Sequence, residues 1–205
     1  MSVRQLVAIV IALAAAALFS RLGFWQLGRL EERREFNALV ASRADSLPVP
    51  LAVLPADTGL SRFRRVRVAG TYDWEHQIVL SGRSRNGSPG VYLLAPLLPS
   101  GSDTALLVYR GWVYSPDAMR VDLARWREPD TASFEGFVLP YPTAPREGSP
   151  VLRGHPRALR WLDPVAARAL VPYPLASYTV VALGDGGDAA RLPVRLEVPP
   201  LDAIS

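Results

Sequence analysis

The chain has 205 residues, enough for one globular domain with a sizeable core, and a net charge of +4 from 23 basic and 19 acidic residues. It contains no cysteine, which excludes disulfides, thiolate metal sites and thiol catalysis. The basic residues, all arginine, are spread along the chain without the basic stripe and interleaved aromatics typical of nucleic-acid binding. We therefore expect no nucleic-acid partner.

The first predicted element is a membrane-spanning helix. Residues 6–20 carry no charge, and apolar side chains continue to Trp25. Only Arg21 interrupts them, and an arginine near the boundary can bury its alkyl stem while its guanidinium reaches the lipid headgroups. The segment then approaches the roughly 20 apolar residues that a span needs. We expect residues 1–25 to form a transmembrane anchor.

A cleaved secretory signal is the alternative interpretation of this segment. Arg4 would be its basic start, and Ala14 to Ala17 offer the small residues of a cleavage site. Apolar character continues past that site through Phe24, which favours an uncleaved anchor. Arginines are frequent just after the span, so charge alone leaves its orientation undecided.

Apolar residues at helical spacing continue beyond the anchor, so residues 26–46 are predicted to form an extramembrane helix that the following prolines end. Residues 47–205 are predicted to form a mainly β domain, an antiparallel sheet or small barrel with short helices. The reason is that short apolar runs alternate with turn-forming residues. The predicted strands are residues 64–72, 77–81, 91–98, 105–114, 133–139 and 177–183.

Glycine, proline and serine mark the predicted loops of this domain, which are residues 82–90, 140–157 and 184–190. One short helix is also expected. Asp163 has the character of a helix N-cap, and Pro164 follows at the first helical position.

No set of residues typical of catalysis or metal binding emerges. The two histidines, His76 and His155, are far apart in the sequence and fall in predicted turns or loops, so we expect solvent-exposed polar residues and not ligands. Asp57 and Asp73 have no partner at a suggestive spacing. We expect a binding protein without enzymatic activity and without a metal.

The densest basic cluster lies in residues 62–67. Guanidinium groups bind carboxylates through two hydrogen bonds, so Arg65 and Arg67 are candidates for contact with a haem propionate or another acidic group. The alternative is a solvated strand face with both side chains pointing into water.

The phrase Arg110-Gly111-Trp112 is the most specific short pattern in the chain. It lies within a predicted strand, where a glycine marks a bulge, a bend or the close approach of another group. Burying an arginine is costly, and a buried tryptophan needs both packing and a hydrogen bond. We expect a charged side chain at Gly111 to abolish the folded domain.

Three phrases, in this order, resemble the surfeit locus protein 1 family of cytochrome c oxidase assembly factors, and the resemblance covers roughly residues 10–200. The first follows the predicted span, the second ends a predicted strand, and the third contains the arginine-glycine-tryptophan phrase. They consist of Gly23, Trp25, Gln26, Leu27 and Arg29; Val68, Gly70, Tyr72 and Asp73; and Val108, Arg110, Gly111, Trp112, Val113 and Pro116.

The resemblance implies a membrane-anchored factor that assists haem a placement in the catalytic subunit of cytochrome c oxidase. It implies the bacterial inner membrane, with the globular domain on the periplasmic side. The implied partners are the lipid bilayer, that catalytic subunit and other assembly factors. The resemblance alone implies a cofactor, haem a, which the protein would bind transiently. The residues implied to act in docking or folding are Trp25, Gln26, Arg110, Gly111 and Trp112.

The family pattern also includes a second membrane helix near its C-terminus, preceded by a histidine-containing phrase. The sequence stops at Ser205, about where that phrase would begin, so it is either a fragment or a member with one span. No haem-ligand role is therefore carried over to His76 or His155.

Two other functions remain open at this point. One is a periplasmic ligand-binding or enzymatic β-domain behind a cleaved signal peptide. The other is a structural subunit held permanently in a membrane complex.

Overall fold

The computed structural model describes residues 2–44, 46–54, 61–143, 146–184 and 193–195. The chain divides into two compact units, Met1–Ser42 and Arg43–Pro199. In chain order the helices and strands are α1 (Val3–Ala44), β1 (Val49–Pro50), η1 (Leu51–Val53), β2 (Arg65–Tyr72), β3 (Ile78–Arg85), β4 (Ser88–Pro99), β5 (Ala105–Tyr114), η2 (Ala124–Trp126), β6 (Thr131–Pro140), β7 (Val151–Leu152), β8 (His155–Leu159), α3 (Pro164–Ala169) and β9 (Leu175–Ala182).

The helix α1 is continuous, so the predicted helix after the apolar segment is confirmed. One 18-residue window in it reaches a mean hydropathy of 2.2, which makes α1 long and apolar enough to cross a membrane. A secretory signal shares these properties. On its polar part Arg29 and Glu32, one helical turn apart, form an exposed ion pair at 3.2 Å.

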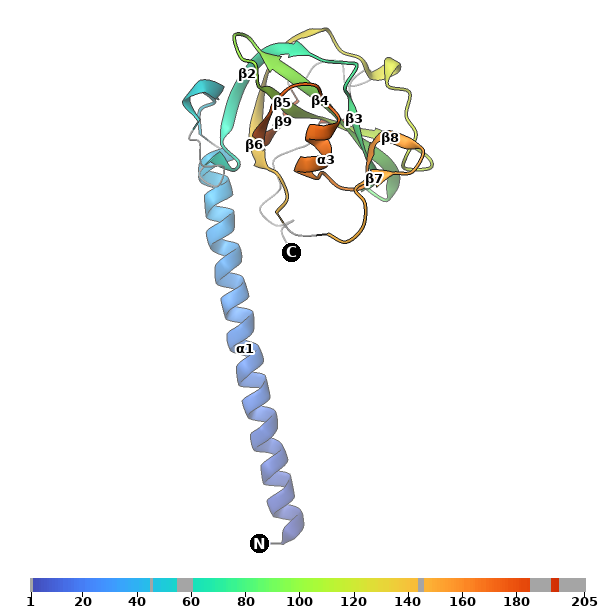
Figure 1. The fold of residues 1–205 in the computed structure, drawn as a ribbon. Helices are drawn as coiled ribbons and strands as arrows, with labels where there is room; N and C mark the ends of the chain where they lie inside the picture. The colour runs from blue at the N-terminus through green and yellow to red at the C-terminus, as the bar shows by residue number, and fades with distance from the viewer. Residues whose placement is uncertain (1, 45, 55–60, 144–145, 185–192, 196–205) are drawn as a thin grey trace. The chain divides into compact units, whose positions relative to one another are not determined.

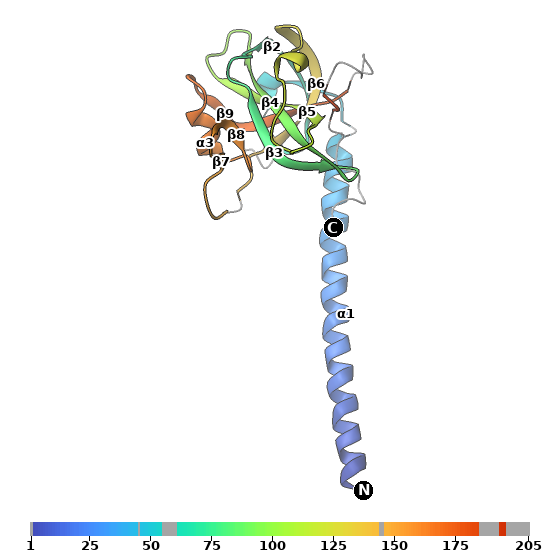
Figure 2. The ribbon, with the colours of Figure 1, turned by 90° about the vertical axis from the view of Figure 1, so that its right-hand side faces the viewer.

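Five strands close into a small barrel, which confirms the predicted mainly β fold (Figures 1 and 2). The order around the barrel is β2-β6-β9-β5-β4, and β4 returns to β2 through the pairing of Thr71 with Leu98. Four of these pairings are antiparallel, whereas β5 and β9 run parallel. Closure pairs both edges of the sheet, which leaves no open barrel edge for aggregation.

Apolar side chains that alternate with polar ones along the strands fill the barrel. Val66 and Val68 on β2 are buried, as the period-two pattern predicted, and Arg67 between them is exposed. Apolar side chains from all five strands meet inside. The buried members of this core are Val66, Val68, Tyr72, Ala95, Leu97, Leu106, Val108, Val138, Val180 and Ala182.

Two predicted loops contain strands, and this part of the prediction was wrong. Within 82–90, β3 continues to Arg85 and β4 begins at Ser88, so only a two-residue turn joins them. Asn86 and Gly87 have φ of 49° and 77°, the left-handed conformation that tight hairpins require. Within 140–157, β7 and β8 extend the sheet beyond β3. The predicted 184–190 turn, apart from Gly184, and Asp57 lie outside the described residues.

The predicted short helix is present as α3. The Asp163 side chain accepts a hydrogen bond of 2.8 Å from the Ala166 backbone N–H, and Pro164 occupies the first turn. Both ribbon views place α3, β7 and β8 together on one flank of the barrel (Figures 1 and 2).

Candidate functional site

A β-bulge in β5 creates the centre of the candidate site. Leu93 of β4 pairs with Gly111 and Leu94 pairs with Tyr109, so Arg110 has no direct partner across the strand pair. Bulges redirect a side chain from the regular alternation. Of the bulge, bend and close approach that the sequence left open for this glycine, the structure shows a bulge, and Arg110 within it is completely buried.

Every nitrogen of the buried Arg110 guanidinium is hydrogen-bonded. Nε donates to Glu128 Oε1 at 2.9 Å, and Nη1 donates to Gln77 Oε1 at 2.9 Å. Nη2 lies 2.7 Å from the same Glu128 oxygen and donates to the Trp126 carbonyl. Burial lowers the pKa of Arg110 and the Glu128 carboxylate opposes that shift. Arginine stays protonated at any physiological pH, so the charge is buried but satisfied.

Glu128 also binds a second arginine. Its Oε2 lies 2.6 Å from Arg195 Nη2, and Arg195 Nη1 donates to the Arg110 carbonyl. We call Arg110, Glu128 and Arg195 the buried ion cluster. It holds two positive charges and one negative charge, and the side chains of Glu128 and Arg195 are only 10% and 17% exposed. Losing the shared carboxylate would leave both guanidinium groups without a counter-ion.

Gly111 and Trp112 lie against the segment that carries Arg195. The Trp112 N–H donates to the Val194 carbonyl and the Val194 N–H donates to the Trp112 carbonyl, both at 2.8 Å. Gly111 has φ of 142°, and a Cβ placed there would lie 2.5 Å from the Val194 carbonyl oxygen. Only glycine satisfies both requirements. The Trp112 ring is buried, and its Nε1 has no hydrogen-bond partner among the described residues.

Aromatic side chains pack against the buried ion cluster. The Arg110 guanidinium carbon lies 4.5 Å from the ring centre of Trp74 and 6.0 Å from that of Tyr72. Trp74 Nε1 in turn donates to Asp130 Oδ1 at 2.8 Å. An open groove of about 510 Å³ is lined by Tyr72, Trp74, Arg127 and Asp130 among others. The buried arginine therefore positions the groove lining from below.

His76 was predicted to be solvent-exposed and Asp73 to lack a partner, and both predictions were wrong. The His76 side chain is 21% exposed, and its Nδ1 lies 2.7 Å from Asp73 Oδ2. The Tyr173 hydroxyl donates to the same oxygen at 2.6 Å. Burial of Asp73 would raise the pKa of its carboxyl group, but the hydrogen bonds from Tyr173 and His76 outweigh burial and lower that pKa.

The other candidate residues lie elsewhere. On β2, Arg65 and Arg67 share Glu135 of β6, with Nη2 atoms 2.7 Å and 3.5 Å from its carboxylate oxygens. Arg67 is 65% exposed and Arg65 only 33%. Trp25 and Gln26 lie on α1 in the helical unit, where they line one groove with Arg29 and Arg33. The Trp25 ring is 59% exposed.

Four residues of the site gave no clear signal in the sequence: Gln77, Glu128, Tyr173 and Arg195. A buried Arg110 requires a carboxylate, but nothing local identifies Glu128 as that carboxylate. Asp73 and His76, three residues apart in a turn, were the one local pairing that could have been found.

The protein belongs to a class defined by two features. A long apolar helix, a candidate membrane span, is followed in the chain by a small closed β-barrel that contains a buried ion cluster. Among the described residues, no group of three or more histidine, aspartate or glutamate side chains is placed to hold a metal ion.

The chain belongs to the SURF1 family, whose pattern matches residues 13–200. It is 35% identical over 104 residues to Surfeit locus protein 1 of Arabidopsis thaliana, covering 45% of this chain and 29% of the plant protein. Identity to a SURF1-like protein of Rickettsia felis is 31% over 104 residues, covering 50% and 44%. Identity to the cytochrome oxidase assembly protein SHY1 of Saccharomyces cerevisiae is 24% over 94 residues, covering 45% and 24%. The matches span less than half the length of these curated relatives.

The close approach at Gly111 predicts a large loss of stability in Gly111→Ala. The variant combines backbone strain with a clash against Val194, and we expect a loss of about 2–6 kcal/mol in the free energy of unfolding. Gly101→Ala is the matched control, because Gly101 also has a positive φ (77°) but no atom within 4 Å of its Cβ position. It should lose only about 1–2 kcal/mol. Equal losses in denaturant titrations of the two variants would contradict the close approach.

The Glu128 carboxylate, shared by Arg110 and Arg195, predicts a second loss of stability. Glu128→Gln keeps the shape of the side chain but leaves Arg110 and Arg195 buried without a counter-ion, and should lower the free energy of unfolding by about 3–5 kcal/mol. Arg120→Gln breaks the exposed 3.8 Å pair with Asp117 and should show no measurable change. A Glu128→Gln protein as stable as the parent in urea would refute the role of the cluster.

The lowered pKa of Asp73 predicts a pH dependence. Because the folded-state pKa lies below the ordinary value of 3.8, the stabilisation is complete above that value and disappears as pH falls through the folded-state pKa. Tyr173→Phe should therefore destabilise the protein at pH 7, with the difference from the parent shrinking below about pH 4. Tyr114→Phe, at a half-exposed ring, is the control. A difference that stays constant from pH 7 to pH 3 would be inconsistent with this assignment.

Proposed function

We propose that this protein is a membrane-anchored assembly factor for haem–copper cytochrome c oxidase, which acts by binding and assists placement of haem a in the catalytic subunit. The observation that carries the proposal is the family match over residues 13–200. The yeast relative is named a cytochrome oxidase assembly protein, which supports the same process. The long apolar helix α1 supports an attachment to the membrane.

In this proposal the chain has three parts: a transmembrane anchor at residues 1–25, an extramembrane helix at 26–46 and the β-rich domain at 47–205. We place it in the bacterial inner membrane with that domain on the periplasmic side. Bacterial relatives such as the protein of Rickettsia felis support a bacterial setting. The partners in this proposal are the bilayer, the oxidase catalytic subunit and other assembly factors.

Exposure divides the proposed functional residues into two groups. Trp25 and Gln26 are exposed on one face of α1 and are proposed to touch the partner directly. Arg110 and Trp112 are buried and Gly111 is covered by Val194, so we propose that they act by holding the barrel and its groove in shape. The distinction rests on accessibility, because a fully buried guanidinium cannot reach a partner surface.

Arg67 is the better placed of the two β2 arginines to meet an acidic group of the client, such as a haem propionate. Its guanidinium is mostly exposed and lies 3.5 Å from Glu135, whereas Arg65 holds that carboxylate at 2.7 Å. The described residues do not offer a haem ligand set. His76 is already bound by Asp73 through Nδ1, and within the described part of the chain no hydrogen bond or ion pair joins it to His155. No axial ligand is therefore assigned.

Complementation tests the proposal. In a bacterium that depends on a haem–copper oxidase and lacks its own family member, the parent chain should restore oxidase activity. Trp25→Ala combined with Gln26→Ala should lower that activity at least about fivefold at equal protein level, because buried tryptophan anchors carry much of the energy of an interface. Leu18→Ala, at another exposed position of α1, should retain it.

One control and two contradicting outcomes complete the test. The intact mass of the membrane-bound protein should show the uncleaved N-terminus, since cleavage near Ala17 would favour the soluble ligand-binding alternative. A parent chain that reaches the membrane at normal level without restoring the oxidase would overturn the proposed function. Full activity of the paired variant would overturn the docking role of the helix face.

A further inference from the structure

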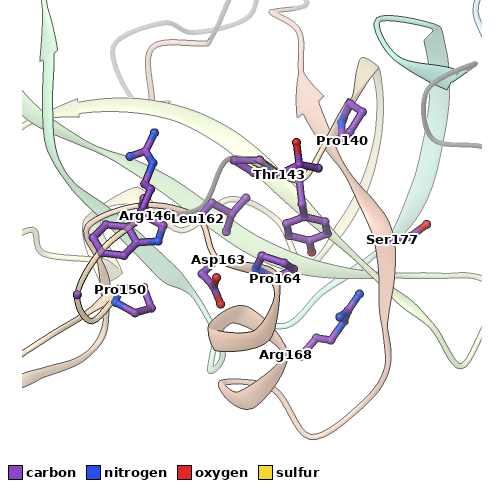
Figure 3. Close-up of a pocket in the computed structure, with 13 residues that line it drawn as sticks. Pro140, Thr143, Arg146, Pro150, Leu162, Asp163, Pro164, Arg168 and Ser177 are labelled. Carbon is purple, nitrogen blue, oxygen red and sulfur yellow. The ribbon is translucent and has the colours of Figure 1, made fainter.

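A second, larger pocket lies away from the buried ion cluster and takes no part in the function proposed above. It is formed by the chain leaving β6, the segment before β7, the start of α3 and one residue of β9 (Figure 3). Its volume of about 620 Å³ lies within the range of roughly 300–1,000 Å³ that is typical of small-molecule sites.

Proline rings and apolar side chains form part of the wall of this pocket. Four prolines line it, and the Trp161 ring and the buried Leu162 add to them. Proline has no backbone N–H and a fixed φ, so these prolines offer a ligand little hydrogen bonding and change shape little. The prolines are Pro140, Pro142, Pro150 and Pro164.

Two arginine side chains line the pocket. Arg168 extends from α3, and Arg146 lies over the Trp161 ring at 6.0 Å from its centre (Figure 3). Neither forms an ion pair with any residue in the described part of the chain. Asp163 is the one acidic residue of the lining, and its carboxylate is occupied as the N-cap of α3. The lining is therefore net positive.

A buried donor without a partner also lines the pocket. Tyr141 is only 8% exposed, and its hydroxyl has no hydrogen-bond partner among the described residues. Burial raises the pKa of Tyr141 to about 12, against a smaller lowering by Arg168, so the hydroxyl is protonated at neutral pH and can donate. A buried hydroxyl without a partner is costly, and a ligand acceptor would remove that cost.

We propose that this pocket binds an anion, a carboxylate or phosphate, carried on an apolar body. The anionic group would accept from the Tyr141 hydroxyl and pair with Arg168 and Arg146. The apolar body would pack against the prolines and Trp161. This inference depends on no property of the oxidase, so it stands or falls separately from the proposed function.

Calorimetry on the full chain in neutral-lipid nanodiscs tests the site, with 2-naphthoate as probe, its uncharged analogue 2-naphthamide and inorganic phosphate. Empty nanodiscs give the background. We expect saturable binding of the naphthoate, with naphthamide and inorganic phosphate each at least about tenfold weaker, because one lacks the charge and the other the apolar body.

Variants assign the contacts. Arg168→Gln and Arg146→Gln should each weaken naphthoate binding about tenfold, and Tyr141→Phe about fivefold. Arg153→Gln is the matched control, because Arg153 is exposed in the turn between β7 and β8 and does not line the pocket. Arg168 is exposed, so its variant tests the proposal even if Tyr141→Phe fails to fold.

The outcomes separate clearly. Equal binding of naphthoate and naphthamide, unchanged affinity in both arginine variants, or no saturable binding at millimolar probe would overturn the site. If inorganic phosphate bound as tightly as naphthoate, the claim that the ligand carries an apolar body would be overturned. Adding phosphatidylglycerol to the nanodiscs identifies the source of the anion. Competition with naphthoate supports a lipid headgroup as the ligand, and its absence supports a soluble anion.

Discussion

The burial of one guanidinium constrains this domain more than any other contact. Arg110 is fully buried at a bulge in β5, so its charge requires a carboxylate and further acceptors nearby. Glu128, Gln77 and the Trp126 carbonyl supply them from two loops. Arg195 then ties the segment after β9 to the same carboxylate. The barrel core would close without these contacts, but the loops at this position would lose their shared anchor.

This arrangement fits a protein that works by presenting surfaces. The hydrogen-bonding groups of the buried ion cluster are satisfied within the domain, Arg110 packs against the Trp74 ring, and the neighbouring groove is open. The pocket beside α3 has the opposite character, with exposed cations and a buried donor that lacks a partner. One region is thus satisfied internally, whereas the other presents unsatisfied groups to a ligand.

Local patterns in the sequence predicted much of the fold. Alternation identified β2, an apolar run identified β5, and Asp163 with Pro164 identified α3. The hairpin over 82–90 was expected, but its loop was predicted too long because the polar residues of β3 resemble a loop, although only Asn86 and Gly87 turn. The parallel pairing of β5 with β9 and the partnership of Arg110 with Glu128 were not predictable, since they join residues whose proximity only the closed barrel creates. An irregularity at Gly111 was expected because a glycine inside a strand has a local cause, but its kind was left open.

Amide hydrogen exchange in Arg110→Met tests the central claim most directly, because methionine fills the space but cannot bind Glu128. If the buried ion cluster anchors the loops, protection should fall together at the N–H groups of Trp112, Val194 and His76, while the β2–β6 pairing stays protected. Unchanged protection at Val194 and His76 would contradict the account, because these segments would then be held without the arginine.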